Sequence, residues 1–196
     1  MPTGILAIDQ ATTLGWAFAE PGQAPIWGEL RLGPRGAWEG KVYHELRTWL
    51  IARIETDDPQ HMAFEAPIEV PPNPEAPPWV AVNSHASRRR ADGLIAHLVE
   101  IAEEHRLGCH EYQSTEATKF LTGRGRFPGD TAEERRRAKQ TATVAACAAF
   151  GWSVTHNSGS AIAILLIAER DLYPQAARSR RKAFRDPTGP LFKATA

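Results

Sequence analysis

GILAIDQATTLGWAFA, at residues 4–19, is the stretch that decides the fold. It begins with an apolar run that ends in an acid, Asp9, and a second apolar run covers residues 15–19 after a short polar turn. Short apolar runs bounded by turn residues indicate buried strands. Together with the alternating segment 26–32, they predict three strands joined as an antiparallel meander, with Asp9 at the end of the first strand.

The remainder of the chain alternates between helical and strand patterns. Four segments carry apolar residues at helical spacing: 38–54, 86–105, 131–150 and 160–172. Residues 115–121 can add a short helix, and further strands are expected at 61–66 and 109–112. The proline-rich stretch 67–78 is expected to be a loop. This order predicts an α/β fold, with a mixed five-stranded sheet, a parallel central pair of strands and helices on both faces.

Length and composition favour one domain. The chain has 196 residues, of which 42% are apolar, and this is too short for two ordinary domains. We expect the domain to cover residues 1–172 and the basic segment 173–196 to be a poorly ordered tail. No segment approaches the roughly 20 apolar residues of a membrane span, and no signal-peptide pattern is present. We therefore expect a soluble, cytoplasmic protein with no membrane partner and with both cysteines reduced.

Two acids stand near the ends of strands that are far apart in the sequence. Asp9 ends the run ILAID, and Glu65 ends MAFE. Burying a carboxylate is costly unless a cation or hydrogen-bond donors compensate it. One such acid alone is ordinarily a surface residue or a helix cap. Two at matched positions on adjacent parallel strands favour a shared hard cation, and Mg²⁺ prefers such oxygen ligands.

The order of three motifs resembles that of the RuvC family of Holliday junction resolvases, which have a ribonuclease-H-like fold. Residues 7–17, AIDQATTLGWA, are similar to the family's first strand and turn, in which an acid is followed by Gly-Trp-Ala. Residues 62–67, MAFEAP, are similar to its second acidic strand. Residues 119–126, KFLTGRGR, followed by Lys139 and an alanine-rich helix, resemble its next block. The likeness covers most of residues 4–172.

This resemblance implies an enzyme, a homodimeric endonuclease that hydrolyses phosphodiester bonds in four-way or otherwise branched DNA. It implies two Mg²⁺ ions, for which Mn²⁺ can substitute, held by about four acidic or imidazole ligands. Asp9 would bridge both ions, and Glu65 would hold one of them.

The formal net charge is zero, but basic residues cluster. Arginine runs on amphipathic helices ordinarily face water. Arg124 and Arg126 are stronger candidates for phosphate contacts, because the glycines between them let the backbone approach a phosphate. The residues predicted to contact DNA are Arg88, Arg89, Lys119, Arg124, Arg126 and Lys139.

The start of the closing helix departs from the family pattern. The two expected ligands fall on Asn157 and Ser160, and neither is a carboxylate. Three explanations stay open: the protein binds junctions without cutting them, His156 replaces a ligand, or the two residues are inactivating substitutions. His156 sits one position early and would point elsewhere on a helix, so its ordinary interpretation is a solvated or capping residue. Asn157 or Ser158 as the helix N-cap is the ordinary account of this polar cluster.

Two other functions compete with the nuclease. Residues 9–13, DQATT, are similar to the DQGTT phosphate loop of actin-like sugar kinases. Ala11 opposes this interpretation because it replaces the glycine that lets the backbone approach phosphate. A catalytically inactive junction-binding protein agrees with Asn157 and Ser160. Trp79, in the proline-rich stretch, could stack on an unpaired base, although packing within its own loop is the more ordinary role.

Overall fold

Five strands form one mixed sheet in the computed structural model, which describes residues 4–34, 36–67 and 78–185. The strands are β1 (Gly4–Asp9), β2 (Thr13–Ala19), β3 (Ile26–Arg31), β4 (Pro59–Glu65) and β5 (Gly108–Tyr112). Their order is β3-β2-β1-β4-β5, with the first three antiparallel and β4 and β5 parallel to β1. This confirms the five-stranded mixed sheet predicted from the sequence, and it places the ends of β1 and β4 side by side.

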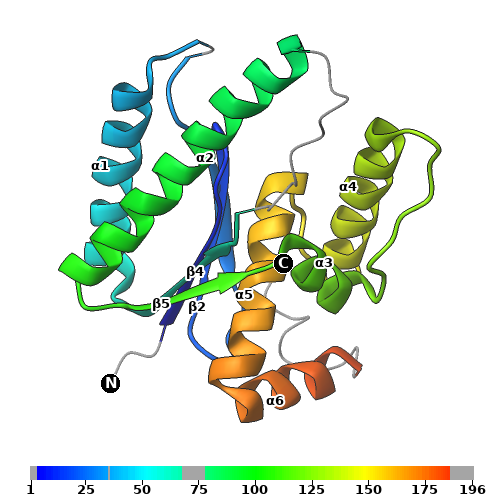
Figure 1. Cartoon of the computed structure of the whole chain (residues 1–196). Coiled ribbons are helices and arrows are strands. Elements are labelled where there is room, and N and C mark those ends of the chain that lie inside the picture. Colours follow the sequence, from blue (N-terminus) through cyan, green and yellow to red (C-terminus); the bar gives the residue numbers. More distant parts are fainter. Residues whose placement is uncertain (1–3, 35, 68–77, 186–196) are drawn as a thin grey trace.

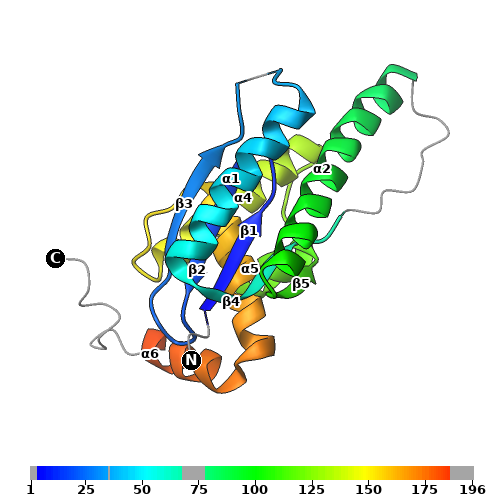
Figure 2. The ribbon, with the colours of Figure 1, turned by 90° about the vertical axis from the view of Figure 1, so that its left-hand side faces the viewer.

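Helices cover both faces of the sheet. On one face lie α1 (Glu39–Asp57) and α2 (Pro78–Glu104). On the other lie α3 (Ser114–Thr122), α4 (Ala132–Ala148) and α5 (His156–Leu172), and α6 (Pro174–Arg185) follows α5 (Figures 1 and 2). No helix among the described residues is long and apolar enough to cross a membrane.

Alternation along β1 divides the core between the two faces. Leu6 and Ile8 pack with the helices α1 and α2, whereas Ile5 and Ala7 pack with α5. Alanines from three strands face α5, so this helix can lie close to the sheet, and all of its residues from Ala161 to Glu169 are buried. A helix so enclosed is rigid, and its first turn has a fixed place above the ends of β1 and β2.

Two parts of the chain differ from the expectation. Residues 174–185 form α6 where a poorly ordered tail was expected, because Ala177 and the Arg180 side chain are buried against α5. The continuation at 186–196 lies outside the described residues. Helix α2 begins at Pro78, well before residue 86, since proline is accepted in the first turn of a helix. Trp79 therefore belongs to a helix, and its side chain lies outside the described part of the structure.

Candidate active site

Asp9 and Glu65 lie next to each other at one edge of the sheet. Ile8 and Phe64, the residues before them, are register partners on the parallel strands β1 and β4. The two carboxyl groups are close enough for each to act on the protonation of the other. Burial, followed by the negative charge of Glu65, raises the pKa of Asp9 to about 8. The pair therefore holds a proton near neutral pH, which is the state expected of two close carboxylates whose negative charges are only partly compensated.

Gln10 fixes the position of Glu65. Its side-chain amide donates to the carbonyl oxygen of Glu65 and accepts from the backbone N–H of the same residue at 3.1 Å. The amide thus replaces the backbone partner that β4 loses where β1 ends. Sequence reasoning did not assign a role to Gln10. Its only signal is its place directly after Asp9, and nothing in its spacing shows that it reaches across to a second strand.

The first turn of α5 brings Ser160 to the carboxylates. Gly15, the register partner of Asp9, lies so close to α5 that a Cβ there would be 2.1 Å from the Asn157 carbonyl oxygen. The helix is therefore seated directly on β2. The Ser160 side chain is close enough to the Asp9 carboxyl group to lower its pKa, an effect that is smaller than the increase from burial and Glu65.

The structure gives His156, Asn157 and Ser158 other places than that of a metal ligand. His156 is exposed, and Asn157 is half-buried with its carbonyl against Gly15. The N-cap of α5 is Thr155, which forms a capping box with Ser158, so neither Asn157 nor Ser158 holds that position. Within residues 4–34, 36–67 and 78–185, no three His, Cys, Asp or Glu side chains gather to hold a metal ion. His156 thus does not complete a three-ligand site with Asp9 and Glu65.

Lys139 lies beside the carboxylates. It is part of α4, its positive charge lowers the pKa of Asp9, and its Nζ donates to the Ser114 Oγ at 2.6 Å. Lys139 was predicted from the sequence to contact DNA. In the structure its positive charge lies close to the carboxyl pair. Ser114, which begins α3, was not predicted to take part.

The remaining basic candidates divide between the two faces of the sheet. Lys119 at the end of α3, and Arg124 and Arg126 in the following loop, are exposed. On the opposite face, Arg88 and Arg89 are exposed on α2, and Arg89 forms an ion pair with Glu39 of α1 at 3.1 Å. The structure therefore does not bring the six predicted DNA contacts into one cluster.

Comparison with known proteins gives a likeness in structure. No protein-family model and no curated protein sequence matches this chain. Its structure is similar to that of Thermus thermophilus RuvC in complex with a Holliday junction substrate, with a TM-score of 0.59 and 12% identity over 87% of this chain and 95% of that chain. A second structure of that RuvC has a TM-score of 0.56 and 14% identity, over 88% and 97% of the two chains.

A third similar structure is that of the yeast mitochondrial Holliday junction resolvase Ydc2. Its TM-score is 0.54 and its identity 9%, over 94% of this chain and 82% of that chain. These proteins share the sheet and helix arrangement described above. Their sequence identities to this chain are too low for their sites to be compared residue by residue. The chain has the ribonuclease-H-like fold of the RuvC-type resolvases that its sequence resembles.

Proposed function

We propose that this chain is a divalent-metal-dependent endonuclease that cuts phosphodiester bonds in four-way or otherwise branched DNA. One observation carries the proposal: two acids end the neighbouring parallel strands β1 and β4 at the same edge of the sheet, and the pKa of Asp9 is raised to about 8. A pair of this kind costs stability and is useful where a cation binds. The fold supports the choice of substrate, because RuvC of the same fold has been solved with a Holliday junction.

The donor set fits one hard divalent cation, Mg²⁺ or Mn²⁺, at Asp9 and Glu65. Such a cation supplies Lewis-acid stabilisation to a phosphate that undergoes hydrolysis. The two-ion arrangement implied by the resemblance is less well supported by these residues, because Ser160 offers a neutral hydroxyl where the family has an acid. We therefore propose that a second ion is held weakly.

The chain's own residues supply positioning and charge. Gln10 holds the backbone of Glu65, and the Ser160 hydroxyl orients the Asp9 carboxyl group. Lys139, beside the pair, carries the positive charge that a DNA phosphate would meet there. Lys119, Arg124 and Arg126 would contact phosphates farther along the strand. We place this nuclease domain at residues 1–172, with α6 packed onto it, and we propose a homodimer because a four-way junction has two equivalent strands to cut.

The direct test is Mg²⁺-dependent nicking of a synthetic four-way junction. Asp9→Asn removes one charge of the pair and is expected to lower the cleavage rate by about 100-fold or more, because metal-assisted stabilisation amounts to several kcal/mol. Glu55→Gln, at an exposed acid on α1, is the matched control and should cleave as the unchanged protein does. An Asp9→Asn protein with full activity would show that the site lies elsewhere.

A junction-binding protein without nuclease activity is the second candidate. The contact between Ser160 and Asp9 favours it, since a hydroxyl stands where the resemblance implies an acid. The same assay separates the two functions. Junction binding without nicking at any Mg²⁺ or Mn²⁺ concentration would establish the binder and overturn the nuclease.

A further inference from the structure

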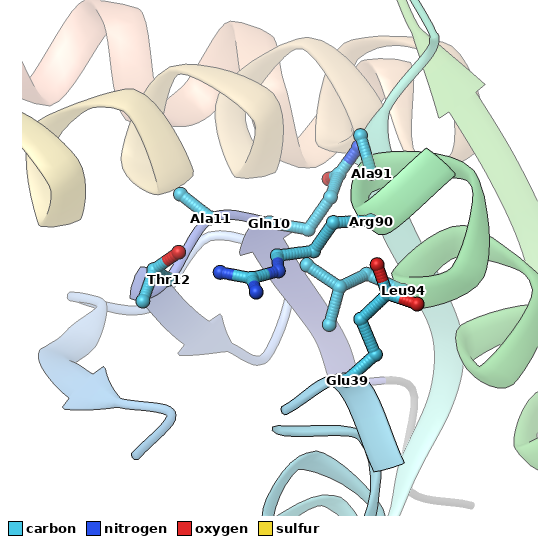
Figure 3. A pocket seen from close by; sticks show the side chains of 7 residues that line it. All are labelled: Gln10, Ala11, Thr12, Glu39, Arg90, Ala91 and Leu94. Carbon is cyan, nitrogen blue, oxygen red and sulfur yellow. The ribbon is translucent and has the colours of Figure 1, made fainter. Parts of the chain in front are cut away.

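Two adjoining cavities form a groove that leads away from the carboxyl pair on the α1 and α2 side. The first has a volume of about 380 Å³ and is lined by the turn after β1, including Gln10 and Thr12 (Figure 3). The second, of about 540 Å³, extends to Trp38. Glu39 and Arg90 line both cavities, so the two are neighbours. The groove therefore begins at the residue that clamps Glu65 and ends at a tryptophan.

Trp38 is an exposed aromatic surface at the outer end of this groove. The residue is 74% exposed, and it occupies the N-cap of α1, where it makes no side-chain capping bond. Residues with a side-chain oxygen are preferred at that position, so tryptophan is a poor choice for helix stability. A Cβ on Gly40 would lie 2.1 Å from the indole ring, which shows that the ring rests on the first turn of α1. One part of the ring is supported, and the rest is open to solvent.

The walls of the groove hold Trp38 in place. Arg90 donates to the carbonyl oxygen of Ala37 at 3.2 Å, and this bond ties the segment before Trp38 to α2. Gly93 of α2 lets the Tyr43 hydroxyl approach closely, since a Cβ there would lie 2.2 Å from it. Helices α1 and α2 are thus in close contact beneath the groove. A supported aromatic ring loses little conformational freedom on binding a ligand, which favours affinity.

The charges of the groove suit a nucleotide. Arg89 and Arg90 line it on one side, and Glu39 is the one acid among its described lining residues. Figure 3 shows the Arg90 guanidinium between Thr12 and Glu39, within the first cavity. Guanidinium groups bind phosphate through planar pairs of donors, and an open indole stacks on any base. An aromatic platform beside two arginines therefore matches one base with its phosphate.

We propose that this groove binds an unpaired nucleotide of the DNA, with the base stacked on Trp38 and the phosphate at Arg90. The inference rests on the proposed function, because branch points are where unpaired nucleotides flank a duplex. Binding here would direct the strand along Gln10 toward Asp9 and Glu65. Trp38 is thus a positioning residue for the substrate.

The test uses branched DNA that carries 2-aminopurine at an unpaired position. The unchanged protein is expected to quench this fluorophore by stacking. Trp38→Ala should remove the quenching and weaken binding about tenfold, whereas Trp38→Phe should keep part of both effects. Ile26→Ala, which removes an exposed apolar side chain on β3, is the control and should change neither.

Glu39→Gln tests the role of charge in the groove and is expected to change DNA binding in the opposite direction to Trp38→Ala. It removes the acid of the groove and releases Arg89 from its ion pair, so binding of the same DNA should become tighter by about threefold at low salt. A purely structural role for Glu39 would weaken binding. Weaker binding by Glu39→Gln, or full quenching by Trp38→Ala, overturns the proposal.

Binding and cleavage are measured separately, so the two proposals can fail independently. Trp38-dependent quenching without nicking overturns the nuclease and keeps the groove. Nicking by the unchanged protein without quenching overturns the groove and keeps the nuclease. If Trp38→Ala alters the oligomeric state and leaves quenching intact, Trp38 belongs to a contact between copies, and the nucleotide site is wrong.

Discussion

Two carboxyl groups in the interior of this protein have opposite surroundings. Glu169 on α5 is 2% exposed and accepts bonds from Arg180 at 2.7 and 2.8 Å and from the N–H of Gly22. Asp9 at the end of β1 faces another carboxyl group, that of Glu65. A buried acid with a full set of partners connects parts of the fold. A buried acid that faces a like charge is poorly compensated within the fold, and a cation from outside can supply what it lacks.

The largest effect is expected at the compensated acid. Arg180→Ala leaves Glu169 buried without its partner, and this should lower the free energy of unfolding by about 3 kcal/mol in urea denaturation. Arg178→Ala, at an exposed arginine of the same helix, is the matched control and should have little effect. Equal stability of the two variants would mean that α6 contributes nothing to the folded core.

At the poorly compensated acid, Asp9, substitution should increase stability. The pKa of Asp9 is raised from 3.8 to about 8, so the folded protein holds a proton that the unfolded chain releases. Stability therefore falls as the pH rises from about 4 to about 8, and it stays level above that range. Asp9→Asn removes this dependence and should raise the free energy of unfolding at pH 8 by about 2 kcal/mol without metal, less than the full pKa shift would give because the site is partly open to water.

The Asp9→Asn variant and the unchanged protein are compared by urea denaturation at pH 5 and at pH 8 in the presence of a chelator. The gain over the unchanged protein should be present at pH 8 and small at pH 5. A gain that is the same at both values would show that the carboxyl of Asp9 ionises normally in the fold.

A third acid at the site should tighten metal binding and should destabilise the metal-free protein. Ser160→Asp places a carboxylate where the hydroxyl now contacts Asp9, so Mg²⁺ binding should tighten by about tenfold, and the metal-free protein should be less stable at pH 8. Isothermal titration with Mg²⁺ measures the first effect. Ser160→Asn has a similar size and no charge, and it should not tighten binding. If the two variants bind Mg²⁺ equally, Ser160 does not face the ion.

The smallest effect is expected where an acid is compensated only at the surface. Glu133 accepts bonds from Arg136 and Arg137 on α4, and all three side chains are exposed. Solvent screens such pairs, so Glu133→Gln should leave the urea midpoint nearly unchanged. A loss as large as that of Arg180→Ala would contradict the view that burial decides the importance of a pair.

Patterns of apolar residues made much of the fold predictable. The strand at 4–9 follows from a short apolar run, and so does the strand predicted at 61–66, which the structure places at 59–65. The acids Asp9 and Glu65 end these two strands. Helix α6 could not be predicted in this way, because it is held against α5 by the small side chain of Ala177 and by the ion pair between Arg180 and Glu169. In the sequence, that arginine looks like one more basic residue of a tail. Periodicity reports a repeated apolar face and cannot report a single buried contact.

For the site, the sequence alone determined which acids stand at strand ends and that residue 160, where the resemblance to the resolvases implies an acid, is a serine. Only the tertiary structure decided what surrounds them: Gln10 clamping Glu65, Lys139 beside Asp9, and Trp38 at the end of an adjoining groove. The physical reason is that the positions of the strands along the chain follow from apolar patterns, which are local. The contacts of a polar side chain depend on which distant elements the packed core brings next to it.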